Sequence, residues 1–177
     1  MMLKIMLDNG MVDANTVVAF ANTGKEREET LEFVRDCGEA FGVKIWWVEY
    51  IPEKPLYRIV DFDTASRSGE PFEALTRRAK YLPNAVQRIC TGDLKIKPIN
   101  RLMKKELGFS GYVKYMGIRA DELSRYLKLK DTAEMPLFDF NVTKQHVRTF
   151  WDAQPFDLKI KDGWGNCDLC FQKGRAY

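Results

Sequence analysis

Only four cysteines and one histidine occur among the 177 residues, and no apolar stretch approaches the length of a membrane span. Four cysteines are too few for a small secreted domain held together by disulfides. One histidine excludes zinc sites that need two or more of them. A membrane helix needs about 20 apolar residues, so none is predicted. The 28 basic and 25 acidic residues leave a net charge of only +3, which does not indicate a nucleic-acid partner.

The composition is that of an ordinary globular domain. Hydrophobic residues make up 45% of the chain and charged residues 30%. The first ten residues hold one lysine and an apolar stretch shorter than the ~7–15 residues of a signal peptide, and no small-residue cleavage site follows. We therefore expect a reduced, cytoplasmic protein that is neither secreted nor bound to a membrane.

A strand, a helix and a second strand follow one another near the start of the chain. Residues 17–21 form a short apolar run, which is typical of a strand buried on both faces of a parallel sheet. Apolar residues then recur at helical spacing up to Gly42, with Glu26 placed in the first turn, and residues 44–50 predict the next strand. This pattern predicts an α/β fold with an open, mostly parallel, Rossmann-like sheet flanked by helices. Ligands would bind at the carboxyl ends of its strands.

The rest of the chain predicts loops, helices and one more strand. Residues 51–69 are loop-like, and helices are predicted from Pro71, from Pro98 to Gly108 and over residues 143–154. Residues 112–118 predict a strand. We expect one α/β domain over residues 1–162 and a cysteine-bearing segment, residues 163–177, packed on it.

Asn22-Thr23-Gly24 lies where the first predicted strand gives way to a helix. Free backbone N–H groups at such a point can bind the phosphate or ribose of a nucleotide. Alternatively, the glycine supplies the turn and the threonine caps the helix. The local sequence leaves both interpretations open.

Arg119 and Arg125 follow the last predicted strand at a spacing that could point two guanidinium groups toward one site. Arginine side chains match phosphate and sulfate oxygens in bidentate fashion. The alternative is a surface pairing of Arg125 with Asp121 or Glu122. Spacing alone does not decide between them.

Cys167 and Cys170 form a C-x-x-C motif in a glycine-flanked loop. Two thiolates at this spacing can share a metal ion or a cluster, or form a redox disulfide, and the alternative is a pair of unrelated thiols. Cys37 lies on the apolar side of the first predicted helix, where we expect a small buried residue. His146 is expected to pack or face solvent in its helix.

Five segments, in this order along the chain, resemble the motifs of a known family: residues 17–30 (VVAFANTGKEREET), 64–72 (TASRSGEPF), 88–98 (RICTGDLKIKP), 117–122 (GIRADE) and 165–171 (GNCDLCF). The family is that of the phosphoadenosine phosphosulfate (PAPS) reductases, within the adenine-nucleotide alpha-hydrolase (PP-loop) superfamily. The likeness is greatest to its small, often phage- or prophage-encoded members, which would place the protein in the host cytoplasm.

The resemblance implies a nucleotide site and a metal site. Cys90, Cys167 and Cys170 would hold a [4Fe-4S] cluster, or alternatively zinc, although Thr91 stands where the family has a second cysteine. The residues implied to bind an adenine nucleotide such as PAPS or ATP are Asn22, Thr23, Gly24, Arg67, Lys95, Arg119 and Arg125. The implied activity is thiol- or iron–sulfur-dependent reduction of a sulfonucleotide, or sulfur transfer, with a thioredoxin-like reductant.

Two family features are absent. The chain has no Gly-Gly pair, so it lacks the family's S-G-G-x-x-S phosphate loop, and residues 2–10 resemble the end of the helix that follows that loop. The usual first strand is therefore expected to be missing, which would leave a sheet edge for a second copy or a partner chain to cover. The chain also ends at Tyr177 without the family's nucleophilic cysteine, so the catalytic residue stays unassigned.

Two alternatives follow from these departures. One is a catalytically impaired protein of phage type that binds a nucleotide or a partner and acts in regulation. The other is a sulfur-transfer enzyme acting on tRNA or DNA, for which the basic runs at residues 77–80 and 95–105 could track a nucleic-acid backbone.

Overall fold

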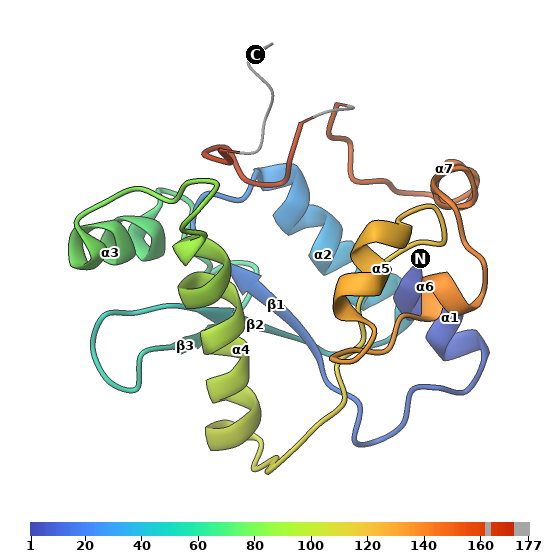
Figure 1. Ribbon diagram of the computed structural model, residues 1–177, viewed down its shortest axis with the longest axis horizontal. Helices are drawn as coiled ribbons and strands as arrows, with labels where there is room; N and C mark the ends of the chain where they lie inside the picture. The colour runs from blue at the N-terminus through green and yellow to red at the C-terminus, as the bar shows by residue number, and fades with distance from the viewer. Residues whose placement is uncertain (162–163, 172–177) are drawn as a thin grey trace. The chain divides into compact units, whose positions relative to one another are not determined.

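The computed structural model describes residues 1–161 and 164–171, and its contacts divide the chain into two compact units (Figure 1). We call Met1–Thr16 with Ser110–Asp157 the helical unit, and Val17–Phe109 with Leu158–Tyr177 the sheet unit. Of the predicted cysteine-bearing segment, residues 163 and 172–177 lie outside the described residues. Its described part, residues 164–171, belongs to the sheet unit.

The sheet unit is built on three strands in the order β1-β2-β3: β1 (Val18–Asn22), β2 (Ile45–Glu49) and β3 (Arg58–Val60). β1 and β2 are parallel, with Asn22 opposite Glu49, whereas β2 and β3 are antiparallel. The predicted α/β class and the first two strands are thus confirmed. The sheet is small and mixed, and β3 lies in a segment that was predicted to be a loop.

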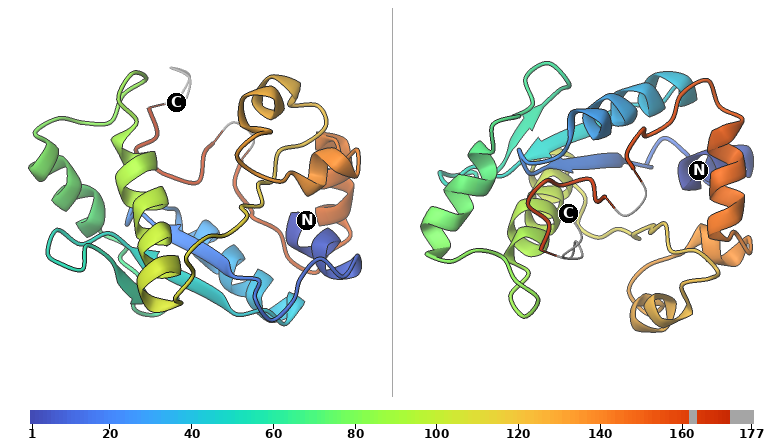
Figure 2. Two further views of the ribbon diagram at one scale, coloured as in Figure 1. Left: turned by 60° about the horizontal axis from the view of Figure 1, so that its bottom comes forward. Right: turned by 90° about the horizontal axis from the view of Figure 1, so that it is seen from above.

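Helices cover both faces of this sheet (Figure 2). Trp47 and Val48 are consecutive in β2 and therefore point to opposite faces. Trp47 packs with Leu31 of α2 (Glu28–Phe41), and Val48 packs with Leu102 at the start of η2. The second layer is one continuous helical stretch: η1 (Cys90–Ile96, π-helical), α4 (Lys97–Arg101) and η2 (Leu102–Glu106, π-helical).

A third cluster joins α3 (Glu70–Ala79) to η1 through Tyr50, Phe72, Leu75 and Leu94. This packing explains why the helix that was predicted to begin at Pro98 begins at Cys90. Proline is tolerated near the start of a helix, so it suggested a boundary there. Leu94 is fully buried in the cluster, and tertiary packing extends the helix ahead of the proline.

The helical unit contains four short helices: α1 (Met2–Asp8), α5 (Leu123–Leu129), α6 (Pro136–Asp139) and α7 (Lys144–Asp152). α7 confirms the helix predicted over residues 143–154, and its capping box joins Thr143 and His146. The strand predicted over residues 112–118 is wrong. That segment makes only one isolated bridge, between Tyr115 and Glu134, and a strand needs a partner along its length.

Within the described part of the chain, β1 pairs only with β2, so its other side forms an edge of the sheet. Whether a second copy or another chain covers this edge stays a prediction. No helix among the described residues is both long enough and apolar enough to cross a membrane.

Candidate functional site

The carboxyl ends of β1 and β2 meet in a buried polar network centred on Glu49, whose side chain is fully buried. Its Oε1 accepts hydrogen bonds from Asn22 Nδ2 and from the Ser66 backbone, both at 2.6 Å. Its Oε2 accepts hydrogen bonds from the Arg58 guanidinium at 2.7 and 2.9 Å and from Ser66 Oγ at 2.9 Å. Both carboxylate oxygens are therefore satisfied, as a buried charge requires. The network fixes Asn22 at the end of β1.

Gly24 is locked into a turn that only glycine fits. Its N–H donates to Asn22 Oδ1 at 3.1 Å, and its φ of 74° lies in the left-handed region. A Cβ added there would lie 2.7 Å from Pro71 Cδ and 3.0 Å from Gly69 Cα. The predicted Asn22-Thr23-Gly24 loop is thus ordered against the start of α3. Its glycine supplies the turn, and nucleotide binding stays a prediction.

Thr23, Glu26, Lys95 and Cys167 come together immediately after this turn. The Thr23 hydroxyl donates to Glu26 Oε1 at 3.2 Å, and Lys95 Nζ donates to the same oxygen at 2.9 Å. The Glu26 side chain is fully buried, whereas the Lys95 side chain is 43% exposed. Glu26 was predicted in the first turn of a helix, but α2 begins only at Glu28. The Thr-x-x-Glu spacing of residues 23 and 26 is a capping-box signature that could have identified the pair.

The C-x-x-C motif docks on the residues that follow the turn. Cys167 pairs with Glu26 in an isolated antiparallel bridge. The Arg27 N–H donates to the Asn166 carbonyl, and the Asp168 N–H donates to the Lys25 carbonyl, both at 2.8 Å. Figure 2 shows this red segment beside the helical stretch that contains η1. Two segments of the sheet unit that lie far apart in the sequence, residues 25–27 and 166–168, are therefore joined by backbone hydrogen bonds.

Arg27 strengthens this docking with its side chain. Its Nη2 lies 2.8 Å from Asp168 Oδ1, and its guanidinium lies 4.3 Å from the centre of the Trp164 ring. An ion pair and a cation–π contact from one side chain each contribute up to about 1 kcal/mol at partly exposed sites. The Arg27 side chain is only 19% exposed, so both contacts are partly shielded from solvent.

The environment of Cys167 keeps its thiol protonated. Burial raises the pKa of this thiol, and the Glu26 carboxylate raises it further. A hydrogen bond from the Leu169 backbone, the Lys95 charge and a hydrogen bond with the Thr23 hydroxyl oppose this rise without cancelling it. Glu26 Oε2 is buried and has no hydrogen-bond partner. An unsatisfied buried acceptor costs about 1–3 kcal/mol of stability, and such atoms are rare in folded proteins.

The three cysteines predicted to hold a metal are not gathered into a ligand set. Across residues 1–161 and 164–171, no group of three or more His, Cys, Asp or Glu side chains is arranged to hold a metal ion. Cys90 packs against the apolar cluster of Tyr50 and Leu94, whereas Cys167 contacts Thr23. The metal centre of Cys90, Cys167 and Cys170 therefore stays a prediction, and no step proposed below passes through it.

Arg67, another predicted nucleotide-binding residue, is paired within the protein. Its Nε and Nη2 lie 2.8 and 3.0 Å from the two carboxylate oxygens of Glu28 at the start of α2. Its Nη1 donates to the Ala65 carbonyl at 3.0 Å. Arg67 thus joins the loop after β3 to α2, and a ligand would have to share it with Glu28.

Arg119 and Arg125 lie in the helical unit and are both paired locally. Of these pairs, the one between Arg125 and Glu122 was the predicted alternative to ligand binding. Arg119 Nε lies 2.9 Å from Asp121 Oδ1 and its Nη1 lies 3.3 Å from Glu122. Arg125 Nη1 lies 2.5 Å from the same glutamate. Partial burial raises the pKa of Glu122, but hydrogen bonds from the Arg119 backbone and from Arg125 bring it below its usual value. That Arg119 and Arg125 bind a nucleotide stays a prediction.

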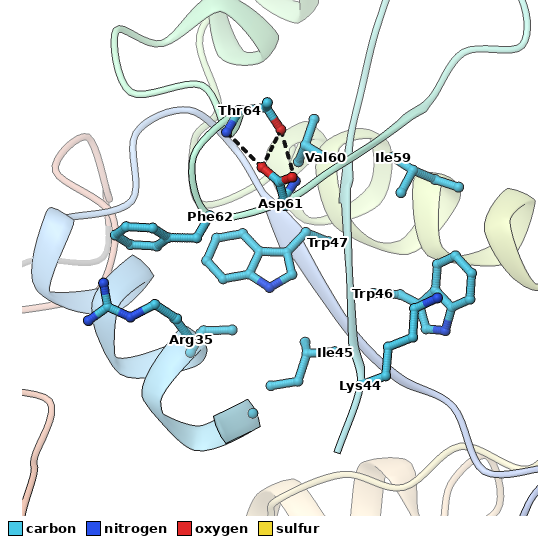
Figure 3. Close-up of a pocket in the computed structure, with 12 residues that line it drawn as sticks. Arg35, Lys44, Ile45, Trp46, Trp47, Ile59, Val60, Asp61, Phe62 and Thr64 are labelled. Atoms are coloured by element: carbon cyan, nitrogen blue, oxygen red, sulfur yellow. Dashed lines mark hydrogen bonds between the residues drawn. The ribbon is translucent and has the colours of Figure 1, made fainter. Parts of the chain in front are cut away.

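An open cavity of about 480 Å³ lies between α2 and the strands, at the amino end of β2 (Figure 3). Its floor includes Trp47, which makes an edge-to-face contact with Phe62 at 6.2 Å. Arg35 stacks over Phe62 and Lys44 stacks over Trp46. Both cations on its rim are therefore engaged by aromatic rings, and the cavity lies away from the carboxyl ends of β1 and β2.

No protein-family model matches the chain, and no solved structure matches it. The chain is similar to the "Uncharacterized nin region protein ORF290" of Escherichia phage lambda, with 32% identity over 170 residues. The alignment covers 87% of this chain and 55% of the phage protein. The chain thus spans about half the length of the curated relative it matches, and that relative's name states no activity.

Proposed function

We propose that this protein binds an adenine nucleotide or sulfonucleotide at the carboxyl end of β1, on a Rossmann-like, adenine-nucleotide alpha-hydrolase-like fold. The observation that carries the proposal is the docking of the C-x-x-C turn beside Asn22-Thr23-Gly24 and Lys95. Ligands of open α/β sheets bind at the carboxyl ends of the strands. Beside such a loop, a lysine can bind the anionic groups of a sulfonucleotide, and a thiol can act as the nucleophile in its reduction.

The chemistry proposed is PAPS reductase-like. Two thiols would give up two electrons and form a disulfide, while the sulfonate group of the sulfonucleotide leaves as sulfite and the nucleotide is released. A thioredoxin-like protein would then reduce the disulfide. Lys95 is suited to the anionic group because its ammonium is partly exposed and already lies at this end of β1. The phage relative supports a phage-type protein.

Calorimetric titration with adenosine 3′,5′-bisphosphate, and with PAPS, tests the binding. We expect Lys95→Ala to weaken binding about 10- to 100-fold, because a charge-assisted hydrogen bond contributes about 1.5–3 kcal/mol. Lys97→Ala is the matched control, since Lys97 lies in the same helical stretch and pairs with Asp93 at 2.8 Å. No binding by the parent protein, or an equal loss in both variants, would contradict the proposal.

Sulfite release from PAPS with a thioredoxin-type reductant separates the enzyme from its alternative. Nucleotide binding with sulfite release supports the reductase. Nucleotide binding without sulfite release favours the catalytically impaired, regulatory protein. Iron, zinc and acid-labile sulfide, measured on protein purified without oxygen, test the predicted metal centre. About four irons that are lost on Cys90→Ser would establish a [4Fe-4S] cluster.

A further inference from the structure

The segment that joins α3 to η1 exposes three apolar side chains within six residues. Leu82 is 66% exposed and Val86 is 91% exposed, and Tyr81 beside them is exposed as well. Single exposed apolar residues are common on protein surfaces, whereas a contiguous patch marks an interaction site. The Asn84 side chain holds this patch in place, because its Oδ1 accepts hydrogen bonds from the N–H groups of Val86 and Gln87 at 3.0 and 2.9 Å. A patch that is already ordered loses little conformational entropy on binding.

Positive charge surrounds the patch. We call residues 77–88 the basic segment, because they include no acidic residue and four basic ones: Arg77, Arg78, Lys80 and Arg88. The ion pair of the exposed Arg77 side chain with Glu73 is long, at 3.7 Å. An apolar centre with a polar rim is the usual make-up of a protein–protein interface, in which tyrosine and arginine are enriched. The basic segment therefore has the composition of a docking surface for an acidic protein partner.

The sheet unit also carries a surface of the opposite charge. The 14 residues of α2 contain one basic residue, Arg35, and five acidic ones, so the net charge of α2 is −4 against +4 for the basic segment. The acidic residues are Glu28, Glu29, Glu32, Asp36 and Glu39. Glu32 and Glu39 are exposed. Glu28, Glu32 and Asp36 follow one another at a spacing of four, which places them on one side of the helix. Like charges at this spacing destabilise a helix, and a cationic partner would relieve their repulsion.

The two surfaces cannot meet within one molecule. α2 packs on the face of the sheet to which Trp47 points, whereas the basic segment leads into the helical layer that packs on the Val48 face. Both views of Figure 2 show α2 and the segment after α3 on opposite sides of the strands. Charge complementarity therefore relates the basic segment of one copy to α2 of another.

We propose that the protein associates head to tail, with the basic segment of one copy docked on α2 of the next. The contact joins two different surfaces, so repeated contacts give rings or open chains. The phosphates of a nucleic acid would engage the cations but leave Leu82 and Val86 exposed, which favours a second copy as the occupant. The association needs no nucleotide, so the inference goes beyond the proposed function.

Sedimentation velocity over a range of protein concentrations tests the association. We expect the parent protein to form dimers and larger species in about 0.1 M salt, and its association to weaken about tenfold or more in about 1 M salt, because the Debye length falls from about 10 to 3 Å. Val86→Ser, which keeps every charge, should weaken the association about tenfold because it removes apolar surface from the contact. Its failure to do so would show that the patch is not buried.

Two charge variants, each with one altered surface, test the head-to-tail arrangement. Arg77→Glu with Lys80→Glu leaves two basic and two acidic residues in the basic segment, and Glu32→Lys with Glu39→Lys leaves three of each in α2. Each variant alone should stay monomeric. Their mixture contains one intact basic segment and one intact α2, so we expect it to form dimers but no larger species. A contact between two identical surfaces would not be restored by mixing.

Lys104→Glu with Lys105→Glu is the matched control. It makes the same change in net charge at two exposed side chains of η2, and it should associate like the parent protein. The proposal is overturned if the parent is monomeric at every concentration, if the mixed variants do not associate, or if the control dissociates as far as the charge variants do. Association that disappears on nuclease treatment would also overturn it and would assign the basic segment to nucleic acid.

Discussion

Glu26 and Cys167 are partners in a single antiparallel bridge, and this contact sets the C-x-x-C turn against the loop that follows β1. The bridge is short, so neighbouring contacts have to hold it. Backbone hydrogen bonds on either side of it link Arg27 with Asn166 and Lys25 with Asp168. The candidate site thus depends on a docked segment as well as on the strand ends.

Replacing Arg27 with alanine should loosen this docked segment. The substitution removes the ion pair with Asp168 and the stacking on Trp164, which together contribute about 0.7–2 kcal/mol. We therefore expect the Asp168 amide to exchange about 3- to 30-fold faster with deuterium. Arg77→Ala is the control, because the Arg77 side chain is 83% exposed. Equal protection of the Asp168 amide in parent and Arg27→Ala would show that the backbone contacts suffice.

Gly24→Ala should destabilise the protein more than Gly42→Ala does. Both glycines have a φ in the left-handed region, which costs alanine about 1–2 kcal/mol. Only at Gly24 would the added Cβ also collide with Pro71 and Gly69, whereas nothing lies within 4 Å at Gly42. The collision should add roughly 1–3 kcal/mol. Urea unfolding of the two variants measures the difference, and equal losses would mean that the loop moves aside easily.

Much of the sheet unit could be predicted from local patterns. The apolar run of β1, the helical periodicity of α2 and its closure by Gly42 are all visible in the sequence, and the structure confirms them. β3 could not be predicted in this way. It is three residues long and exists because Arg58 reaches Glu49 across the strands, a contact between side chains of different segments.

Only part of the candidate site could be predicted from the sequence, because contacts between distant segments leave no local pattern. Asn22-Thr23-Gly24 and the C-x-x-C motif stand out because glycine turns and paired cysteines are local signals. That Glu26 is buried, unpaired on one oxygen and opposite Cys167 depends on a bridge between distant segments. No periodicity encodes such a bridge.

Asp93 should stabilise the fold at neutral pH and lose this effect in acid. Burial raises its pKa, but hydrogen bonds from Lys97 and Arg78 bring the pKa below the usual value of 3.8. A carboxyl whose pKa is lowered on folding stabilises the protein above its unfolded pKa, and the effect is lost as the pH falls through the folded pKa.

We therefore expect Asp93→Asn to lower the free energy of unfolding by roughly 0.5–2 kcal/mol at pH 7, from two partly exposed ion pairs. The difference from the parent protein should shrink below pH 4. Urea unfolding at both pH values measures it. Asp131→Asn, whose side chain is 85% exposed, should have little effect at either pH. A loss of stability that does not change with pH would assign the role of Asp93 to packing.

Cys37 should be inert in the folded protein, in keeping with its predicted place on the inner side of a helix. Burial raises the pKa of this thiol to about 11, so only about one molecule in a thousand carries the thiolate at pH 8. An unfolded cysteine with its usual pKa is ionised on the order of one hundredfold more often at that pH. Iodoacetamide should therefore alkylate Cys37 about a hundredfold more slowly in the native protein than in 8 M urea, as followed by peptide mass spectrometry. Alkylation of native Cys37 at the unfolded rate would mean that α2 opens readily from the sheet.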